Sequence, residues 1–434
     1  MRLLLENIGK ISSADIELDG ITVIAGENDT GKSTIGKTLY TIFNSFYDLD
    51  EQIMAVRCEM IENIVGKILW QDRLAVMPME EFAREITDRN AKLSKIDIDY
   101  FKERLQYYLL SQDVSDNGSV SITDASLMKI FDSINQILDV NKEEIFKKIF
   151  QNRVNGEFSK QLTTISTEEM KSNIRLDING NNIEISLENQ NVVGILNPLS
   201  LKTQAIYIDD PLIMDRIASA AESYRRTLKK NMINMSHREH LRNCLMTDEQ
   251  RNEVEYVIDE MIIDKQMKEL EKKINEACEG DFRKNRYYED KKRNGIMVDI
   301  HNVSAGIKIF MVIKQLLKNK VLGEKGTLIL DEPEVYLHPK WQLLFAEIIV
   351  LLQKKYNMHI LLTTHSPYFL RAIEVYAGSH EIADRCNYYL AEKHGVLATL
   401  SNVTNNTEDI YRKLLEPFEA LQMETYQNDT AGRL

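Results

Sequence analysis

The chain has 434 residues, which at roughly 150 residues per domain suggests two or three structural units. It carries 54 Lys and Arg against 67 Asp and Glu, and this net charge of −13 argues against a protein whose whole surface coats nucleic acid. Four widely spaced cysteines without a CxxC pair argue against a disulfide framework or zinc knuckle, and the absence of a signal-peptide pattern or an apolar run of about 18 residues predicts a cytoplasmic protein without a membrane span.

The N-terminal half begins with strand signals and continues with helical ones. Short apolar or alternating runs at 3–7, 14–18 and 21–25 are broken by glycines, which is typical of strands. A helix with apolar residues at spacings of three and four follows, and amphipathic segments continue from 50 to 170.

The C-terminal half alternates between the two kinds of signal. Residues 172–208 contain a predicted hairpin about Asn179-Gly180. Helical periodicity returns over 211–280, where the last helix is predicted at 253–279. Two buried strands separated by a helix are then predicted at 327–330 and 359–363.

These patterns predict an α/β fold with a mixed sheet, interrupted by a helical insertion and a short helical arm. The predicted parts are the N-terminal sheet segment at 1–47, the helical insertion at 48–170, further sheet strands at 171–210, the helical arm at 211–280 and the C-terminal sheet segment at 281–434.

The first motif that carries chemistry is GENDTGKS at 26–33, a complete GxxxxGK[ST] between a predicted strand and a predicted helix. Glycines let backbone N–H groups surround a triphosphate, and the helix N-terminus adds partial positive charge. Lys32 would reach the β- and γ-phosphates, and the Ser33 hydroxyl would bind Mg²⁺. The candidate nucleotide-binding residues here are Gly26, Asn28, Gly31, Lys32, Ser33 and Thr34.

The second motif is TLILDEP at 327–333, an apolar strand that ends in two carboxylates. Ligands of α/β sheets bind at such carboxyl ends. Asp331 would bind the metal directly or through water, and Glu332 would polarise the attacking water beside the γ-phosphate. The competing interpretation is an acidic turn or helix cap.

Two further motifs are weak signals by themselves and become informative only together with the first two. TTHSP at 363–367 places His365 after a strand parallel to 327–330, where an imidazole could sense the γ-phosphate, although a lone histidine at a strand end is often structural. VSAGI at 303–307 opens a helix, and Ser304 and Gly306 are otherwise ordinary residues for a helix start.

Taken together, the motifs resemble the ABC-type ATPase heads of the SMC, RecF and overcoming-lysogenisation-defect (OLD) families. The string DEPEVYLHPKWQ followed by THSPYFL is most similar to the OLD-like bacterial ATPases of the AAA15/AAA21 type, including ATPase subunits of Septu- and PARIS-like anti-phage systems. The resemblance covers about 1–47 and 281–415.

The resemblance implies an ATPase that uses ATP and Mg²⁺ and forms a homodimer or a higher even-numbered oligomer. Ser304 and Gly306 would contact the γ-phosphate bound on a second subunit, so that two ATPs lie between two heads arranged head to tail. Glu332 and His365 would be the catalytic pair, with His365 as the switch histidine.

Three departures from the family pattern suggest slow or gated hydrolysis. Ala305 and Ile307 stand in the signature where LSGGQ has a glycine and a polar residue, and His338 stands at the position of the D-loop aspartate. No clear Q-loop glutamine follows a strand. Asp209 or Asp210 is the positional candidate, with Asp209 as an additional metal ligand, but a simple turn before Pro211 is an equal alternative.

We expect the conformational change to gate a separately encoded effector, such as a nuclease or a toxin, in anti-phage defence. The residues after His365 contain no Asp-x-Asp pair, so the TOPRIM nuclease domain of OLD proteins is not expected in this chain. The alternative is a RecF- or SMC-like ATPase that acts directly on DNA. Nucleic acid therefore remains a possible partner, which two basic clusters would contact. Ordinary solvated helix surfaces also explain these clusters, and Tyr287 and Tyr288 lie beside the second one. The first cluster is Arg225, Arg226, Lys229 and Lys230, and the second is Lys284, Arg286, Lys291, Lys292 and Arg293.

Overall fold

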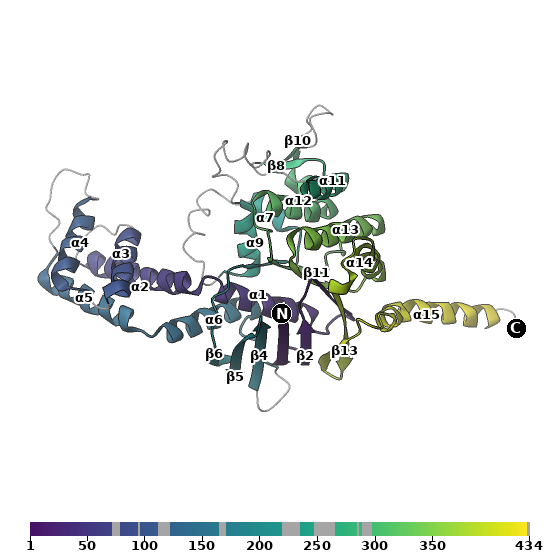
Figure 1. The fold of residues 1–434 in the computed structure, drawn as a ribbon, viewed down its shortest axis with the longest axis horizontal. Coiled ribbons are helices and arrows are strands. Elements are labelled where there is room, and N and C mark those ends of the chain that lie inside the picture. The colour runs from purple at the N-terminus through teal and green to yellow at the C-terminus, as the bar shows by residue number, and fades with distance from the viewer. Residues whose placement is uncertain are drawn as a thin grey trace. The chain divides into compact units, whose positions relative to one another are not determined.

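The computed structural model describes residues 1–71, 79–93, 96–111, 122–164, 171–218, 235–246, 265–283, 286–288 and 297–431 (Figure 1). The chain divides into two compact units, a helical unit at Phe46–Phe150 and a sheet unit formed by Met1–Ser45 and Gln151–Leu434. The helical unit thus ends before residue 170, because α6 (Lys142–Phe158) is one continuous helix whose last residues pack in the sheet unit. Periodicity reveals such a helix but not the unit against which each turn packs.

The sheet unit is built on an 11-stranded mixed sheet in the order β6-β5-β4-β1-β2-β14-β13-β3-β12-β11-β7. Neighbouring strands pair in parallel along the part β13-β3-β12-β11-β7. They pair antiparallel along the part β6-β5-β4-β1-β2. The strands are β1 (Arg2–Ile8), β2 (Ile11–Glu17), β3 (Ile21–Gly26), β4 (Lys171–Ile178), β5 (Asn181–Glu188), β6 (Asn191–Leu196), β7 (Ala205–Ile208), β11 (Thr327–Asp331), β12 (His359–Thr364), β13 (Cys386–His394) and β14 (Leu397–Asn402).

The predicted hairpin is confirmed, because Asn179 and Gly180 connect β4 and β5. Both residues have positive φ, 49° and 84°, as a two-residue turn of this kind requires. A second, three-stranded antiparallel sheet is formed by β8 (Asp281–Arg283), β9 (Arg286–Tyr288) and β10 (Met297–Asp299).

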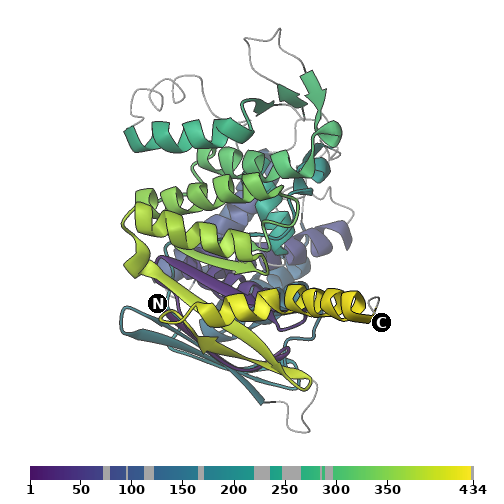
Figure 2. The ribbon, with the colours of Figure 1, turned by 90° about the vertical axis from the view of Figure 1, so that its right-hand side faces the viewer.

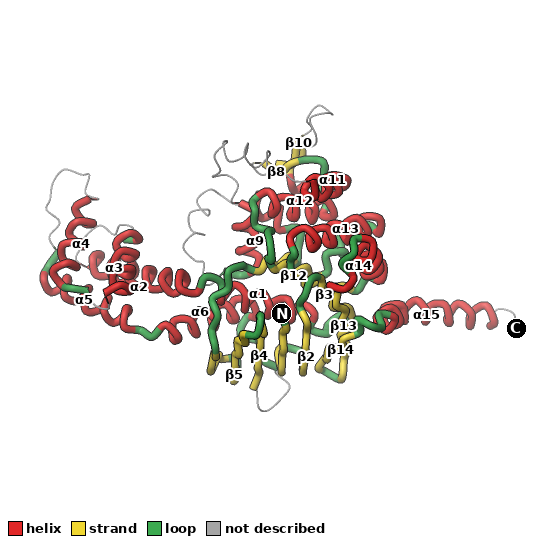
Figure 3. The backbone as a smooth tube through the Cα atoms, viewed as in Figure 1, coloured by secondary structure: helices red, strands yellow, loops and turns green. Residues whose placement is uncertain are grey.

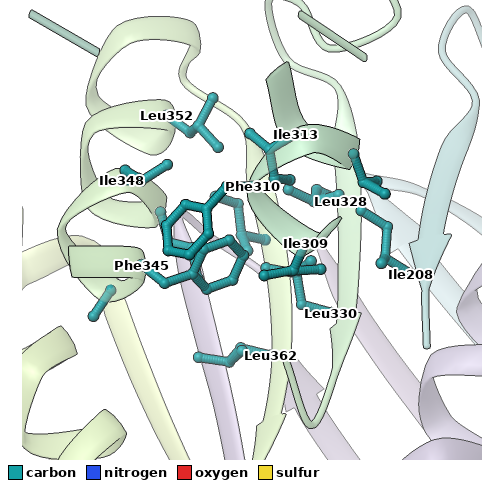
Figure 4. Packing of buried hydrophobic residues seen from close by; sticks show 14 of the residues in the cluster. Ile208, Ile309, Phe310, Ile313, Leu328, Leu330, Phe345, Ile348, Leu352 and Leu362 are labelled. Carbon is teal, nitrogen blue, oxygen red and sulfur yellow. The ribbon is translucent and has the colours of Figure 1, made fainter. Parts of the chain in front are cut away.

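Alternation along the parallel strands gives the sheet two apolar faces. Ile208, Leu328 and Leu362 join the main core, where they pack against Phe310 and Phe345 (Figure 4). These two rings meet edge to face at 5.4 Å between centroids, an arrangement that adds about 0.5–1.5 kcal/mol beyond area burial.

Helices cover the face of the sheet that carries this core (Figures 2 and 3). Pro339 and Pro367 occupy the first positions of α13 and α14, where a missing N–H costs nothing, and Ser366 caps α14 by accepting from Phe369 N–H. The helices on this face are α12 (Ala305–Lys318), α13 (Pro339–Tyr356) and α14 (Pro367–Ser379).

The opposite face of the parallel strands packs against α1 (Lys32–Phe46). A Cβ on Gly36 of this helix would lie 3.1 Å from Ile329 and 3.5 Å from the ring of Tyr207. A glycine at position 36 therefore lets α1 approach the sheet closely, and Tyr207 points to this side while its neighbours in β7 point to the core.

The described helices between 211 and 280 pack against the main core. Ile213, Met214, Leu241, Leu270 and Ile274 all belong to the main apolar cluster. The predicted helix at 253–279 is described only from residue 265 onward. The helices are α7 (Ile213–Ala218), α9 (His237–Met246) and α11 (Lys265–Ala277).

The helical unit has its own core, in which the ring of Phe101 contacts Phe82 and Phe131 at centroid distances of 5.8 and 5.2 Å. Its helices are α2 (Leu49–Gln71), α3 (Glu80–Leu93), α4 (Ile98–Ser111), α5 (Asp124–Asp139) and the first part of α6. The sheet unit ends with α15 (Glu408–Ala431), which contacts the core through Ile410. None of the described helices is both long and apolar enough to cross a membrane.

Candidate nucleotide-binding site

The loop between β3 and α1 requires glycine at two positions of the first motif. A Cβ on Gly26 would lie 2.3 Å from the carbonyl oxygen of Ala391, and one on Gly31, at φ 81°, would lie 2.5 Å from Ile11 Cδ1. Neither position accepts a side chain without moving its neighbours. Helix α1 begins at Lys32, so its first N–H groups point toward the loop.

Two cavities adjoin this loop. The larger, about 480 Å³, is lined by residues 29–34, which include Gly31, Lys32, Ser33 and Thr34, together with Gln161 and Val396. The smaller, about 270 Å³, is lined by Ser33, Asp209, Asp210, Asp331 and Glu332. Ser33 and Glu332 line both cavities, whereas Gly26 is buried beneath the loop and Asn28 is exposed on it.

The amino group of Lys32 is the buried cation of the site. Its side chain is 4 % exposed, and Nζ donates to the carbonyl oxygens of Gly26 at 3.0 Å and Glu27 at 2.7 Å. Burial lowers the pKa of Lys32, although the carboxylates of Glu332 and Asp331 oppose this effect. Lys32 Nζ lies 3.9 Å from Glu332 Oε1.

The expected parallel pairing of β11 and β12 is confirmed, and it brings the second and third motifs together. Glu332 follows β11 with φ 48°, and its N–H donates to the carbonyl of Thr363 at 3.2 Å. Its Oε1 lies 3.2 Å from His365 Nδ1. This ion pair lowers the pKa of Glu332 and raises that of His365.

The carboxylate of Asp331 accepts two hydrogen bonds from neutral hydroxyl groups. Tyr207 donates its OH to Oδ2 at 2.9 Å, and Thr363 donates Oγ1–H to Oδ1. Within the described residues Asp331 has no ion pair, so its negative charge is not neutralised. With Ser33 in the same cavity, these residues fit Mg²⁺, which uses one or two carboxylates together with phosphate oxygens and water.

Two buried residues that support these carboxylates were not identified from the sequence. Glu334 accepts from the Thr364 hydroxyl and from the His365 N–H at 3.1 Å, and thus connects the two loops. Burial raises the pKa of Glu334, and it also raises that of Tyr207 well above its usual range. In the sequence, Glu334 is marked only as the second glutamate of DEPE, and Tyr207 only as the aromatic residue within AIYI.

Asp209 lines the smaller cavity, but its carboxylate is already bound to two cations. Arg238 donates to Oδ2 from Nε at 2.9 Å and from Nη2 at 2.6 Å, and His237 Nε2 lies 3.1 Å from the same oxygen. Burial alone would raise the pKa of Asp209, but Arg238 and His237 outweigh it and hold the pKa well below its usual range. Asp209 would have to release these partners in order to bind a metal.

The signature residues of this chain do not line either cavity. Ser304 is the exposed N-cap of α12, and its side chain makes no capping hydrogen bond. Gly306 is buried, and a Cβ there would lie 3.0 Å from the carbonyl of Tyr336 and 3.2 Å from the ring of Trp341. Close packing of α12 against this segment is therefore a sufficient reason for a glycine at 306.

Two other features named from the sequence have simple structural positions. His338, at the D-loop position, is the N-cap of α13 and accepts from the Lys340 N–H through Nδ1. Arg286, Tyr287 and Tyr288 form β9. The other residues of the two basic clusters lie outside the described part of the chain: Arg225, Arg226, Lys229, Lys230, Lys284, Lys291, Lys292 and Arg293.

Comparison with known proteins relates the chain to a family of ATPase domains. The profile of the AAA_15 family, described as an AAA ATPase domain, matches residues 1–370. The OLD nuclease of Thermus scotoductus is 40 % identical over 68 residues, which are 15 % of this chain and 13 % of that relative, so this chain spans only a small part of its length.

Solved structures of SMC heads also align with the chain. The SMC head domain from Thermotoga maritima covers 93 % of this chain and 98 % of its own at 10 % identity, with a TM-score of 0.37. The SMC head domain with an extended coiled coil bound to the C-terminal domain of ScpA, derived from Pyrococcus furiosus, covers 96 % and 98 % at 10 % identity, with a TM-score of 0.36.

The ion pair of the site makes a prediction about His365. Because the Glu332 carboxylate stabilises the charged imidazolium, the pKa of His365 lies above its ordinary value of 6.5, and Glu332→Gln should lower it. The measurement is a pH titration of ¹³C-labelled histidine by NMR, with the His365 signal assigned by its loss in His365→Asn. Glu324→Gln, at an exposed carboxylate before β11, is the matched control and should leave the titration unchanged. An equal pKa in wild type and Glu332→Gln would contradict the ion pair.

Proposed function

This chain belongs to the AAA_15 family of AAA ATPase domains, and on that premise we propose that it binds Mg-ATP and hydrolyses it to ADP and phosphate. One observation carries the proposal. Three motifs meet at Glu332: its Oε1 lies 3.9 Å from Lys32 Nζ and 3.2 Å from His365 Nδ1. Lys32 and Glu332 line the same cavity, and His365 contacts Glu332. A cation for the phosphates and an ionised carboxylate for the water are parts that phosphoryl transfer to water requires.

Each residue has a role that follows from its surroundings. The N–H groups at the start of α1 and the amino group of Lys32 bind the β- and γ-phosphates. Ser33 and Asp331 would hold Mg²⁺, which neutralises charge on the phosphate oxygens when bound. Glu332 orients the attacking water as a hydrogen-bond acceptor, because its lowered pKa keeps it ionised at neutral pH. His365, which follows the neighbouring strand β12, holds the carboxylate of Glu332 in place.

Removing the charge of Glu332 should separate hydrolysis from binding. Glu332→Gln keeps the shape of the side chain but removes its negative charge and replaces one acceptor oxygen with an NH2 donor, so kcat should fall by about 10²–10⁴. The affinity for ATP, measured by equilibrium binding of a fluorescent analogue, should stay close to that of wild type. Glu324→Gln is again the matched control and should hydrolyse ATP at the wild-type rate. Full activity in Glu332→Gln would overturn the assignment of this carboxylate.

We also propose that two copies of the chain form a head-to-tail dimer that closes over two ATPs. Ser304 supports it, because its exposed hydroxyl and the N-terminal N–H groups of α12 are free of a side-chain cap and suited to an anion. Val335 and Tyr336 line the smaller cavity, and these neighbouring apolar side chains are 53 % and 45 % exposed. A second copy would cover them.

The dimer is tested in the Glu332→Gln background, where ATP accumulates in the site. With Mg-ATP we expect twice the mass of one chain by light scattering, and one chain without nucleotide. Adding Ser304→Arg should prevent dimerisation while ATP binding persists, because a large side chain blocks the approach of the second copy. Ser379→Arg, at an exposed serine near the end of α14, is the control and should still dimerise. If Glu332→Gln alone remains a monomer in Mg-ATP, that result would contradict the proposed dimer with two ATPs between its subunits.

We further propose that the closing and opening of the dimer gates a partner effector, such as a nuclease or toxin encoded separately, in anti-phage defence. The resemblance of DEPEVYLHPKWQ and THSPYFL to ATPase subunits of such systems supports this role, and so does the partial relative named OLD nuclease. The departures in the signature and at His338 suggest slow turnover, which suits a switch that holds one state for a long time.

The partner is tested by capture of tagged Glu332→Gln in Mg-ATP, co-expressed with its neighbouring genes, and by the native mass of the complex. An even-numbered ATPase oligomer with a nuclease-like or toxin-like chain is the expected result. Lys32→Ala, which loses the phosphate contact, is the control and should recover less of that chain. Recovery of a dimer that carries only DNA would instead favour a RecF- or SMC-like role.

A further inference from the structure

The hydroxyl of Tyr207 is the structural feature that the proposed mechanism leaves unused. Tyr207 lies on β7, the strand beside β11 at the edge of the sheet, and its side chain is 1 % exposed. Its OH donates to Asp331 Oδ2 at 2.9 Å. Thr363 of β12, on the other side of β11, donates to Oδ1. The carboxylate of Asp331 is therefore held by one hydroxyl from each neighbouring strand.

Both donors are neutral, and this decides what they do to Asp331. A lysine or arginine in the same place would neutralise the carboxylate and compete with a metal. A hydroxyl fixes the orientation of the group but leaves its negative charge and its remaining lone pairs available. Those lone pairs belong to a carboxylate that lines the same cavity as Ser33.

The ring of Tyr207 is itself fixed by His237. The two rings lie 4.5 Å apart between centroids, with an angle of 31° between their planes. His237 is held between two carboxylates: its Nδ1 lies 2.7 Å from Glu157 Oε2, and its Nε2 lies 3.1 Å from Asp209 Oδ2. The backbone N–H of His237 also donates to Glu157, whose side chain is 1 % exposed.

We propose that Tyr207 is a positioning residue for the metal-binding carboxylate Asp331, and that His237, held between Glu157 and Asp209, keeps the Tyr207 ring in place. This inference rests on the proposed binding of Mg-ATP. Magnesium demands nearly ideal octahedral geometry at short distances, so a carboxylate that is free to rotate binds it less well than one that is fixed. Partners that orient a metal ligand in this way typically change metal affinity by about 10- to 100-fold.

This role explains the position of Asp209 without making it a ligand. The carboxylate of Asp209 binds His237 and Arg238, so it supports the pair of rings formed by His237 and Tyr207. Glu157 gives the same support from α6, the helix that begins in the helical unit at Lys142.

Tyr207→Phe removes only the hydroxyl and keeps the ring that packs on His237. Its matched control is Tyr389→Phe, which removes another buried hydroxyl of the same sheet, one that accepts from Glu17 N–H at 2.8 Å and from Asn402 at 3.2 Å. Mn²⁺ affinity is measured by electron paramagnetic resonance of free Mn²⁺, in the presence of the non-hydrolysable β,γ-imido analogue of ATP. The analogue's affinity without metal and the urea unfolding midpoint are measured on the same samples.

We expect Tyr207→Phe to weaken Mn²⁺ binding by about 10-fold or more. The Mg²⁺ concentration for half-maximal hydrolysis should rise by a similar factor, while metal-free nucleotide affinity and unfolding match those of Tyr389→Phe. Wild-type Mn²⁺ affinity in Tyr207→Phe, or an equal loss in Tyr389→Phe, overturns this inference alone. A wild-type protein that binds no Mn²⁺ with the nucleotide analogue overturns the proposed function as well.

Discussion

The parallel register of β3, β12, β11 and β7 is the constraint on which the rest of the site depends. In parallel strands the carboxyl ends all meet at one edge of the sheet, so the segments that follow β3, β11 and β12 lie together, although β3 ends at Gly26 and the other two strands end at Asp331 and Thr364. The register pairs Asp331 with Thr363 directly. A shift of one residue would turn the hydroxyl of Thr363 to the other face and separate Glu332 from His365.

Three carboxylates within four residues take different electrostatic roles because their surroundings differ. Asp331 accepts hydrogen bonds from two neutral hydroxyls, those of Tyr207 and Thr363. Glu332 pairs with His365, which lowers its pKa. Glu334 is buried among hydrogen-bond donors that carry no charge, so burial dominates and raises its pKa. One short loop can thus contain a metal ligand, a water-orienting group and a structural acid, since each carboxylate faces a different neighbour.

Packing gives a second explanation for residues that a motif singles out. Gly306 resembles a signature glycine, yet a Cβ at that position would lie tightly against the carbonyl of Tyr336, at 3.0 Å, and the ring of Trp341, at 3.2 Å. Asp209 follows a strand as a Q-loop residue would, yet its carboxylate supports His237 and Arg238. Such residues can serve both packing and ligand contact. Ser304 differs from them, because it is exposed and its side chain makes no capping hydrogen bond.

The sequence by itself determined the local elements and the chemistry of the motifs. Alternation and helical periodicity were enough to place β3, α1, β11 and β12, and the residue types at 26–33, 331–332 and 365 predicted the phosphate site, because such signals depend on neighbours along the chain. Only the tertiary structure decided the end of the helical unit within α6, the packing of α7, α9 and α11 on the core, and the contacts of Tyr207, His237 and Glu334. These depend on contacts between segments that are distant in the sequence, and no local period of side chains records which segments will meet.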